Sequence, residues 1–160
     1  MSETYTILQA LKKLEHYCAY QDRCHDEVVS KLKSLKMTAD EIDQVIVKLI
    51  SDNFLNETRF ACSFARGKHR IKQWGKVRIV NELKFRHISA YNITTALKEI
   101  SSEEYYETFE NLSLKTWEGI SEKNKLKKSK KFCDALLRKG FESTLVYEKM
   151  KMLSSTKDEV

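Results

Sequence analysis

Residues 28–49 read VVSKLKSLKMTADEIDQVIVKL, and this stretch decides the fold because its apolar pattern occurs three times in the chain. The second copy, 51 residues further on, is residues 79–100, IVNELKFRHISAYNITTALKEI. The third, after another 53 residues, is residues 132–153, FCDALLRKGFESTLVYEKMKML. Within each copy the apolar positions follow the period of a helix, which predicts two helices joined by a tight turn. Such a unit cannot bury its apolar stripe alone, so neighbouring units are expected to stack.

The repeated pattern predicts an all-α protein, an elongated array of about three tandem three-helix repeats that follows a lead-in helix. The predicted divisions are a lead-in helix in residues 1–21, repeats in residues 22–73 and 74–120, and a partial third repeat with a tail in residues 121–160. Composition agrees, because the chain has no proline and only four glycines, the residues that most often interrupt helices. A closed helical bundle is the alternative arrangement.

Several residues mark the expected helix ends. Residues 38–41, TADE, form a capping-box pattern in which a hydroxyl and a carboxylate satisfy free backbone N–H groups. Gly119 and Gly140 are expected at helix C-termini in the left-handed conformation. His87 takes the place of Gly140 in the second copy, so a positive φ is expected there. Further N-caps are expected at Asn56 and Ser89. Acidic residues at 103 and 104, after two serines, suit another helix N-terminus.

The net charge of +6 is distributed in blocks. Residues 1–65 carry −2, residues 66–98 carry +8, residues 99–122 carry −6 and residues 123–160 carry +6. Such blocks are typical of proteins that attract polyanions or charged protein partners. No apolar run approaches the ~20 residues needed to span a membrane, and the first residues lack a secretory pattern. We therefore expect a cytoplasmic protein.

The densest basic segment lies between residues 64 and 86 and contains one tryptophan. Cations beside an aromatic ring are typical of polyanion binding, since cations contact phosphates and a flat ring stacks on bases. The alternative is a solvated helix face with the tryptophan packed inside. The candidate binding residues are Arg66, Lys68, Arg70, Lys72, Trp74, Lys76, Arg78, Lys84 and Arg86.

Two further charged sets are candidates. The first is a secondary basic patch of lysines: Lys125, Lys127, Lys128, Lys130 and Lys131. Lysines without arginines make weak, non-specific phosphate contacts, so this patch is a candidate for such binding. The alternative is that these lysines only solvate the N-terminus of a helix. The second is an acidic set: Glu103, Glu104, Glu107 and Glu110. These residues either contact a basic partner or keep their helix soluble.

Catalysis finds little support in the sequence. There is no P-loop, no GxSxG and no HExxH, and the four histidines are expected at surface or boundary positions. The four cysteines are expected to be buried free thiols. The alternative for two of these cysteines is a zinc site formed with two histidines: Cys18, Cys24, His16 and His25. The spacing of these four residues matches no common zinc-binding pattern. We expect no enzyme, no metal and no cofactor.

One stretch resembles a known family. Residues 60–68, FACSFARGK, and residues 74–83, WGKVRIVNEL, together with Ile88, are similar to the signature of the RecX regulatory proteins, and residues 49–57, LISDNFLNE, fit as well. The resemblance runs from about Leu11 to Leu153. The sequence departs from the family pattern at three positions. Cys24 replaces the serine that usually precedes the first repeat helix, and Lys36 and His87 replace the usual glycines of the first two tight turns.

The resemblance implies a non-catalytic protein that binds RecA and the RecA–DNA filament. Members of the family commonly inhibit RecA's ATP hydrolysis, strand exchange and stimulation of repressor self-cleavage, and so act in recombination, DNA repair and the SOS response. On this hypothesis the basic residues contact DNA phosphates or acidic RecA surface, and the acidic set contacts basic RecA surface. Changing Lys76 and Arg78 to glutamate is expected to abolish inhibition without unfolding the protein.

Two other functions stay open. A non-specific DNA-binding module would bind single- or double-stranded DNA without RecA, with an affinity that falls steeply in salt. A helical scaffold for another partner is the third reading. In each case we expect a monomer with no membrane association.

Overall fold

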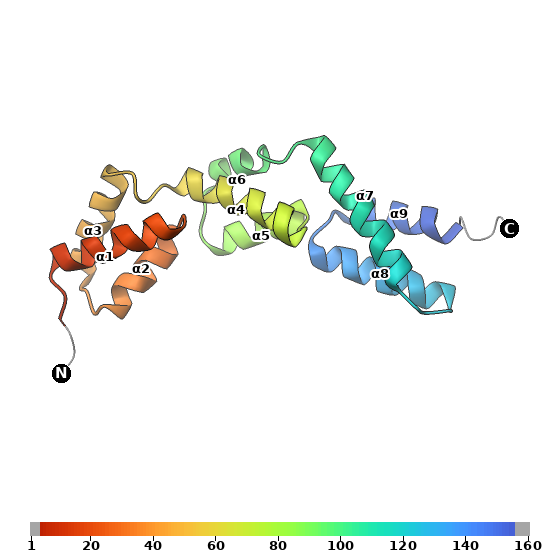
Figure 1. Cartoon of the computed structure of the whole chain (residues 1–160), viewed down its shortest axis with the longest axis horizontal. Coiled ribbons are helices and arrows are strands. Elements are labelled where there is room, and N and C mark those ends of the chain that lie inside the picture. Colours follow the sequence, from red (N-terminus) through yellow and green to blue (C-terminus); the bar gives the residue numbers. More distant parts are fainter. Residues whose placement is uncertain (1–3, 156–160) are drawn as a thin grey trace. The chain divides into compact units, whose positions relative to one another are not determined.

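Residues 4–155, the part of the chain that the computed structural model describes, form α-helices and contain no strand. The predicted all-α class is confirmed. None of the helices in this range has the length and apolar character needed to cross a bilayer. The helices, labelled in Figure 1, are α1 (Ile7–Tyr20), α2 (His25–Ser34), α3 (Ala39–Ser51), α4 (Glu57–Lys72), α5 (Lys76–Phe85), α6 (Ala90–Leu97), α7 (Ser102–Gly119), α8 (Lys125–Lys139) and α9 (Ser143–Ser155).

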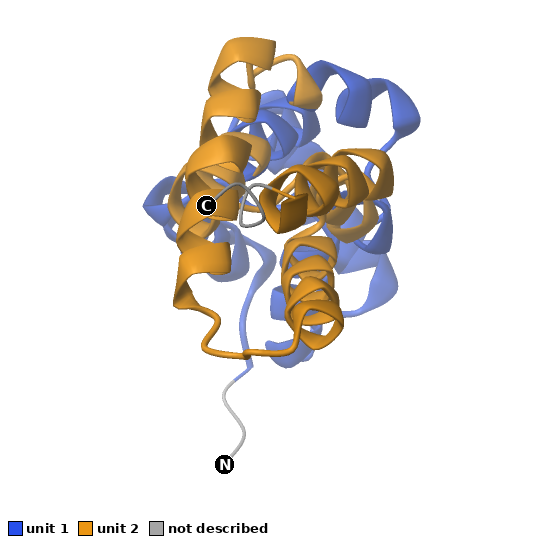
Figure 2. Ribbon diagram, turned by 90° about the vertical axis from the view of Figure 1, so that its right-hand side faces the viewer, with its two compact units in different colours: residues 1–64, 83–96 blue, residues 65–82, 97–160 orange. Residues whose placement is uncertain are grey.

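The chain divides into two units, coloured separately in Figure 2. Among the described residues, unit 1 consists of residues 4–64 and 83–96, and unit 2 of residues 65–82 and 97–155. The three boundaries, after residues 64, 82 and 96, all fall inside helices, so α4, α5 and α6 each contribute residues to both units. The division into repeats after residues 21, 73 and 120 stays a prediction.

The core of unit 1 is formed by α1, α2 and α3. Each helix buries residues three, four or seven positions apart, which puts them on one face. Leu14 of α1, Leu32 of α2 and Leu49 of α3 have no exposed surface. The lead-in helix is therefore part of this core rather than an appendage to it.

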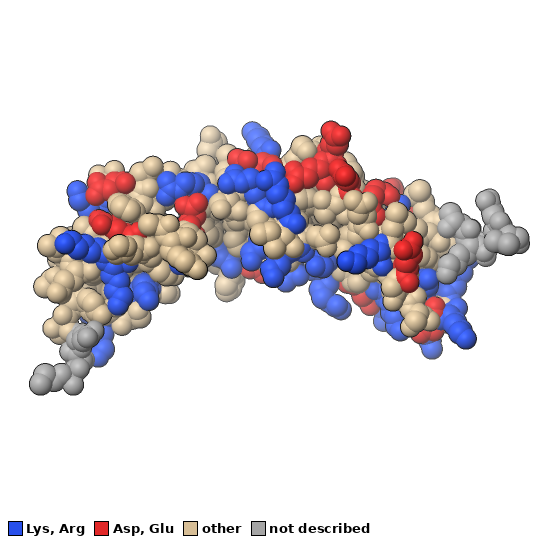
Figure 3. All heavy atoms as spheres, viewed as in Figure 1, with Lys and Arg blue, Asp and Glu red and all other residues tan. Residues whose placement is uncertain are grey.

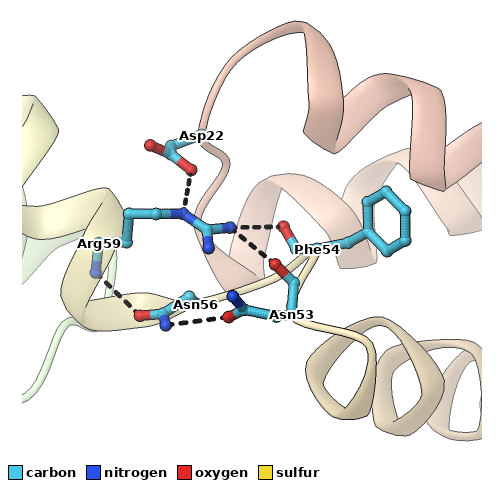
Figure 4. Close-up of polar contacts among 5 residues, drawn as sticks. All are labelled: Asp22, Asn53, Phe54, Asn56 and Arg59. Atoms are coloured by element: carbon cyan, nitrogen blue, oxygen red, sulfur yellow. Dashed lines mark hydrogen bonds and ion pairs between the residues drawn. The ribbon is translucent and has the colours of Figure 1, made fainter.

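Arg59 connects two loops of unit 1 (Figure 4). Its Nε donates to Oδ1 of Asp22 in the α1–α2 loop at 2.7 Å. Its Nη2 donates to the carbonyl oxygens of Asn53 and Phe54 in the α3–α4 loop, both at 3.1 Å. The Arg59 backbone N–H donates to Oδ1 of Asn56 at 2.9 Å, which confirms the predicted N-cap of α4. One guanidinium thus joins the two loops that border the α1–α3 core.

The α5–α6 turn is joined to α2 and α4 within unit 1. His87 in this turn lies 2.6 Å from Asp26, measured between Nδ1 and Oδ2. Asn92 of α6 accepts a hydrogen bond from the Thr58 hydroxyl at 2.8 Å and donates one to Glu57. These exposed or part-buried polar contacts attach the α5–α6 turn and α6 to α2 and α4.

The three tight turns share a left-handed residue at the repeated position. Lys36 has φ 61°, His87 φ 60° and Gly140 φ 95°, which confirms the expectations for His87 and Gly140. The expectation for Gly119 is wrong. It is the last residue of α7, and the chain leaves the helix through Ile120 in an extended conformation (φ −87°, ψ 116°), so no left-handed residue is needed.

Side-chain caps begin several helices as predicted. Thr38 and Glu41 form the capping box of α3, with bonds of 3.0 and 3.3 Å. The hydroxyls of Ser89 and Ser101 accept from the backbone N–H groups three residues later, at 3.2 and 3.1 Å. Each cap satisfies a donor that the first turn of a helix leaves free.

Aromatic rings dominate the core of unit 2. Phe141, at the start of the α8–α9 turn, lies against Phe109 and Tyr105 of α7, with ring centroids 5.1 and 5.5 Å apart. Trp117, near the end of α7, meets Phe132 of α8 edge-to-face at 5.6 Å. Phe132 and Phe141 are fully buried. This core supports the segment in which the densest basic residues lie.

Candidate partner-binding site

The basic signature folds around a sharp corner between α4 and α5 in unit 2; we call residues 68–78 the α4–α5 corner. Gln73 has φ 58° and ends α4. The Trp74 N–H donates to the Lys68 carbonyl at 3.1 Å. His69 lies beneath this turn, and its Nδ1 is 2.9 Å from the Trp74 carbonyl. A carbonyl only accepts hydrogen bonds, so this Nδ1 carries the proton.

His69 is fully buried, and the expectation of a surface or boundary position for it is wrong. Its ring stacks on Tyr105 with centroids 5.3 Å apart, and its Nε2 has no hydrogen-bond partner among the described residues. His69 stands 51 residues after Cys18, which is buried in α1. The repeat therefore contains the signal that position 69 faces a core.

The corner meets the α8–α9 turn main chain to main chain. The Gly75 N–H donates to the Lys139 carbonyl at 2.8 Å, and the Val77 N–H donates to the Gly140 carbonyl at 2.9 Å. A Cβ on Gly75 would lie 2.3 Å from the Gly140 oxygen, and one on Gly140 would lie 2.2 Å from Cβ of Arg78. Both glycines are therefore required by the close approach.

Trp74 is half-buried and carries two cations over its ring. The Lys68 Nζ lies 5.0 Å from the ring centroid and the Arg78 guanidinium carbon 4.1 Å. Arg78 also donates from Nη1 to the Arg138 carbonyl at 3.1 Å. Trp74 thus takes part in intramolecular packing, and Arg78 caps the end of α8.

Lys76 begins α5 and is held against Tyr105. Its backbone N–H donates to the Tyr105 hydroxyl at 3.0 Å, and its Nζ lies 4.7 Å from the centre of the Tyr105 ring. The hydroxyl donates in turn to the Glu142 carboxylate, with 2.9 Å to either oxygen. Burial raises the pKa of the Tyr105 hydroxyl well above its ordinary value, so the phenol stays protonated and keeps donating.

Two arginines of α4 pair with the acidic block. Arg66 lies 3.2 Å from Glu99 and Arg70 lies 2.8 Å from Glu104. In Figure 3 basic and acidic side chains accordingly lie side by side over α4 and the beginning of α7. The hydrogen bond from Arg70 lowers the pKa of Glu104 below its ordinary value. Because solvent screens such accessible pairs, they contribute little to stability.

Six basic residues from three helices lie at or next to the corner. Two of them, Arg138 and Lys139, were not identified in the sequence, because they lie about 60 residues beyond the signature. The Lys139 ammonium donates to the Lys72 carbonyl at 2.9 Å, while the Lys72 side chain itself is exposed and has no partner in residues 4–155. We call this set the corner cations: Lys68, Lys72, Lys76, Arg78, Arg138 and Lys139.

Lys84 and Arg86, the last two candidates of the basic segment, belong to unit 1. The Arg86 guanidinium carbon lies 4.8 Å from the centre of the Phe64 ring. Lys84 is exposed. The structure therefore divides the predicted binding residues between the two units, with most of them in unit 2.

The secondary basic patch of α8 is also divided in role. Lys128 is buried, with Nζ 4.4 Å from the centre of the Trp117 ring, and belongs to the packing of unit 2. Lys131 pairs with Glu122 at 3.4 Å. Lys125, Lys127 and Lys130 are exposed. Three of the five lysines therefore keep exposed side chains.

The acidic set is likewise part paired and part exposed. Glu104 pairs with Arg70, and Glu110 accepts a 2.5 Å hydrogen bond from the buried Lys149. Glu103 and Glu107 are exposed on α7 and have no side-chain partner among the described residues. Half of the set therefore contributes to the fold of unit 2.

All four cysteines are free and buried, as predicted from their apolar neighbours. Cys24 lies 3.3 Å from Glu27, and burial raises the pKa of its thiol to about 11. Within residues 4–155 no group of three or more histidine, cysteine or acidic side chains is arranged to hold a metal ion.

Comparisons with known proteins agree on one family. The family model "RecX, second three-helix domain" matches residues 56–97. The regulatory protein RecX of Oceanobacillus iheyensis is 24% identical over 96% of this chain. A crystal structure of regulatory protein RecX superposes with a TM-score of 0.80 and 25% identity, covering 91% of this chain and 72% of that one. A crystal structure of RecX from Lactobacillus salivarius gives 0.77 and 26%, covering 92% and 96%.

Tandem three-helix repeats with a charged corner define a helical-repeat protein, and the prediction of such repeats is confirmed. Over most of its length the chain is similar to RecX proteins, and a RecX domain model matches residues 56–97. Its relatives are named as regulatory proteins, which agrees with the prediction of a non-catalytic protein. The chain spans about half the length of the curated relatives it matches.

Proposed function

We propose that this protein binds RecA and the RecA–DNA filament and, without chemistry of its own, inhibits RecA's ATP hydrolysis, strand exchange and coprotease activity. The observation that carries the proposal is the convergence of the corner cations in unit 2 on a fold shared with solved RecX proteins. Like charges held close together repel one another, so an acidic protein surface or a phosphate backbone stabilises them.

A helical filament presents the same surface many times, which suits a protein built from repeats. When one chain makes more than one contact with a polymer, the second contact forms at a high effective concentration. Individually weak charged contacts, such as those of exposed lysines, then suffice for tight binding. The exposed Glu103 and Glu107 would contact basic RecA surface in the same complex.

The direct test is the ATPase activity of RecA on single-stranded DNA while this protein is titrated in. Lys72→Glu is the preferred variant, because this side chain is exposed and has no partner among the described residues. Changing Arg78 instead would remove a bond to the Arg138 carbonyl and confuse binding with folding. We expect Lys72→Glu to raise the inhibitory concentration about tenfold.

Lys33→Glu on α2 of unit 1 is the matched control, since Lys33 is also exposed but lies outside the corner. Its inhibition should equal that of the wild type. A wild-type protein that leaves the ATPase unchanged at saturating concentration would exclude the proposed inhibition.

Direct binding to DNA is the second candidate, favoured by the exposed lysines of α8 at positions 125, 127 and 130. Binding of a fluorescent oligonucleotide with and without RecA separates the two functions. A DNA-binding module binds equally well without RecA, whereas a filament modulator requires it.

A further inference from the structure

Two bulky apolar side chains are exposed among the corner cations. Ile71, at the end of α4, is 79% exposed, and Val77, at the start of α5, is 45% exposed. A phosphate backbone is recognised by cations and hydrogen-bond donors and makes no use of such groups. The cores of protein–protein interfaces, in contrast, combine apolar residues with tryptophan and arginine. Ile71 and Val77 beside Trp74 and Arg78 match the second composition.

Unit 1 contains a related corner between α1 and α2, with contacts at the equivalent positions of the repeat. Residues 17, 23 and 27, which precede residues 68, 74 and 78 by 51 positions, are Tyr17, Arg23 and Glu27. The Arg23 guanidinium carbon lies 3.8 Å from the Tyr17 ring centre, and Arg23 pairs with Glu27 at 3.5 Å. The aromatic residue and the cation have thus exchanged places between the two corners.

The exposed apolar residue recurs as well. Tyr20 stands 51 residues before Ile71 and is 83% exposed. The charges differ, however, because the first corner contains Asp22 and Asp26. The second has Gln73 and Val77 at those positions, with the corner cations around them. Of these two equivalent corners, only the α4–α5 corner therefore combines an excess of positive charge with exposed apolar groups.

We propose that the α4–α5 corner docks an acidic protein segment that carries a bulky apolar side chain. Ile71 and Val77 contact the apolar side chain, and Lys72, Lys76 and Lys139 surround the carboxylates. Charge complementarity selects an acidic occupant, and the two apolar residues select a protein over a nucleic acid. The inference rests on the proposed function, in which the partner is RecA.

The test compares three forms of the full chain: wild type, the double variant Ile71→Ser and Val77→Ser, and Tyr20→Ser. Each is titrated against RecA without DNA and, separately, against a single-stranded oligonucleotide at the same salt concentration. Circular dichroism checks that helix content is unchanged. We expect the double variant to bind RecA about tenfold more weakly and the oligonucleotide within about twofold of wild type. Tyr20→Ser should match the wild type in both titrations.

The docking surface is overturned if the double variant binds RecA as well as the wild type, or if it loses oligonucleotide binding to the same extent. An equal loss with Tyr20→Ser also overturns it, because the effect would then come from any exposed apolar residue. A wild-type chain that binds no RecA refutes the proposed function, and the docking inference with it.

Discussion

Gly75 has no room for a side chain, and its replacement gives the sharpest prediction for a single residue. In Gly75→Ala the new Cβ would meet the Gly140 carbonyl, a main-chain atom that cannot turn aside. We expect the free energy of unfolding to fall by about 1–3 kcal/mol in urea denaturation. Gly67→Ala is the control, because nothing lies within 4 Å of its Cβ inside α4. It should stabilise the protein by about 1 kcal/mol.

Glu104 yields a prediction about pH. Its pKa is lowered by the hydrogen bond from Arg70. A carboxyl whose pKa is lower in the folded state adds stability above its unfolded pKa, and this stability is lost as the pH falls through the folded value. In Arg70→Gln the pKa of Glu104, followed by NMR titration, should rise toward its ordinary value. In Arg66→Gln, which removes the partner of Glu99 instead, it should not move.

Single residues were predictable where the repeat or local chemistry determines them. The left-handed φ of His87 follows from its alignment with Gly140, and the burial of the cysteines follows from their neighbours. The pairing of each cation in the basic segment was not predictable in this way. Nothing within the basic segment indicates that Arg70 pairs with Glu104 while Lys72 has no partner, because the difference depends on which helix lies opposite.

At the scale of elements, Arg59 is predicted to hold the α1–α2 and α3–α4 loops in place. Arg59→Lys keeps the charge but loses the planar fork that reaches two carbonyls and Asp22. We expect a loss of about 1–2 kcal/mol in the free energy of unfolding, toward the low side because the side chain is 37% exposed.

Asp22→Asn is the companion variant, since it weakens only the ion pair and leaves both carbonyl bonds. Its cost should stay below about 1 kcal/mol. If Asp22→Asn proves as damaging as Arg59→Lys, the carbonyl bonds contribute nothing and the account of this junction is incorrect.

The helices themselves were the most predictable part of the molecule. Apolar spacing located them, and the capping residues Thr38, Asn56, Ser89 and Ser101 marked their beginnings. Ends without such a signal were harder to predict. Gly119 predicted a left-handed residue at the end of α7, but α7 ends without one. Asn53 and Gln73, in contrast, have positive φ although neither is a glycine.

At the scale of the whole molecule, positive charge is concentrated in one unit. Residues 1–64 and 83–96 have no net charge, so residues 65–82 and 97–160 carry the entire +6. The sequence showed two basic blocks. It could not show that Arg138 and Lys139 join the corner, because that contact depends on how α8 folds back.

This partition predicts where salt-dependent binding resides. For a single-stranded oligonucleotide, each lost phosphate contact reduces the slope of log affinity against log salt by about 0.7. Lys72→Ala should show about that reduction, measured by fluorescence anisotropy at several salt concentrations. Lys33→Ala should leave the slope unchanged, and equal slopes for both variants would mean that total charge alone drives binding.

The main-chain approach of Gly75 to Gly140 also limits how the chain can be rearranged. The residue equivalent to Gly75 in the first copy is Cys24, whose side chain would collide with the Gly140 carbonyl. A protein engineer who wished to lengthen the molecule by duplicating residues 22–73 in front of the last two helices could not do so by simple insertion. The repeats share one apolar pattern, but of these two only the second has a glycine at the position that lets the α8–α9 turn approach main chain to main chain.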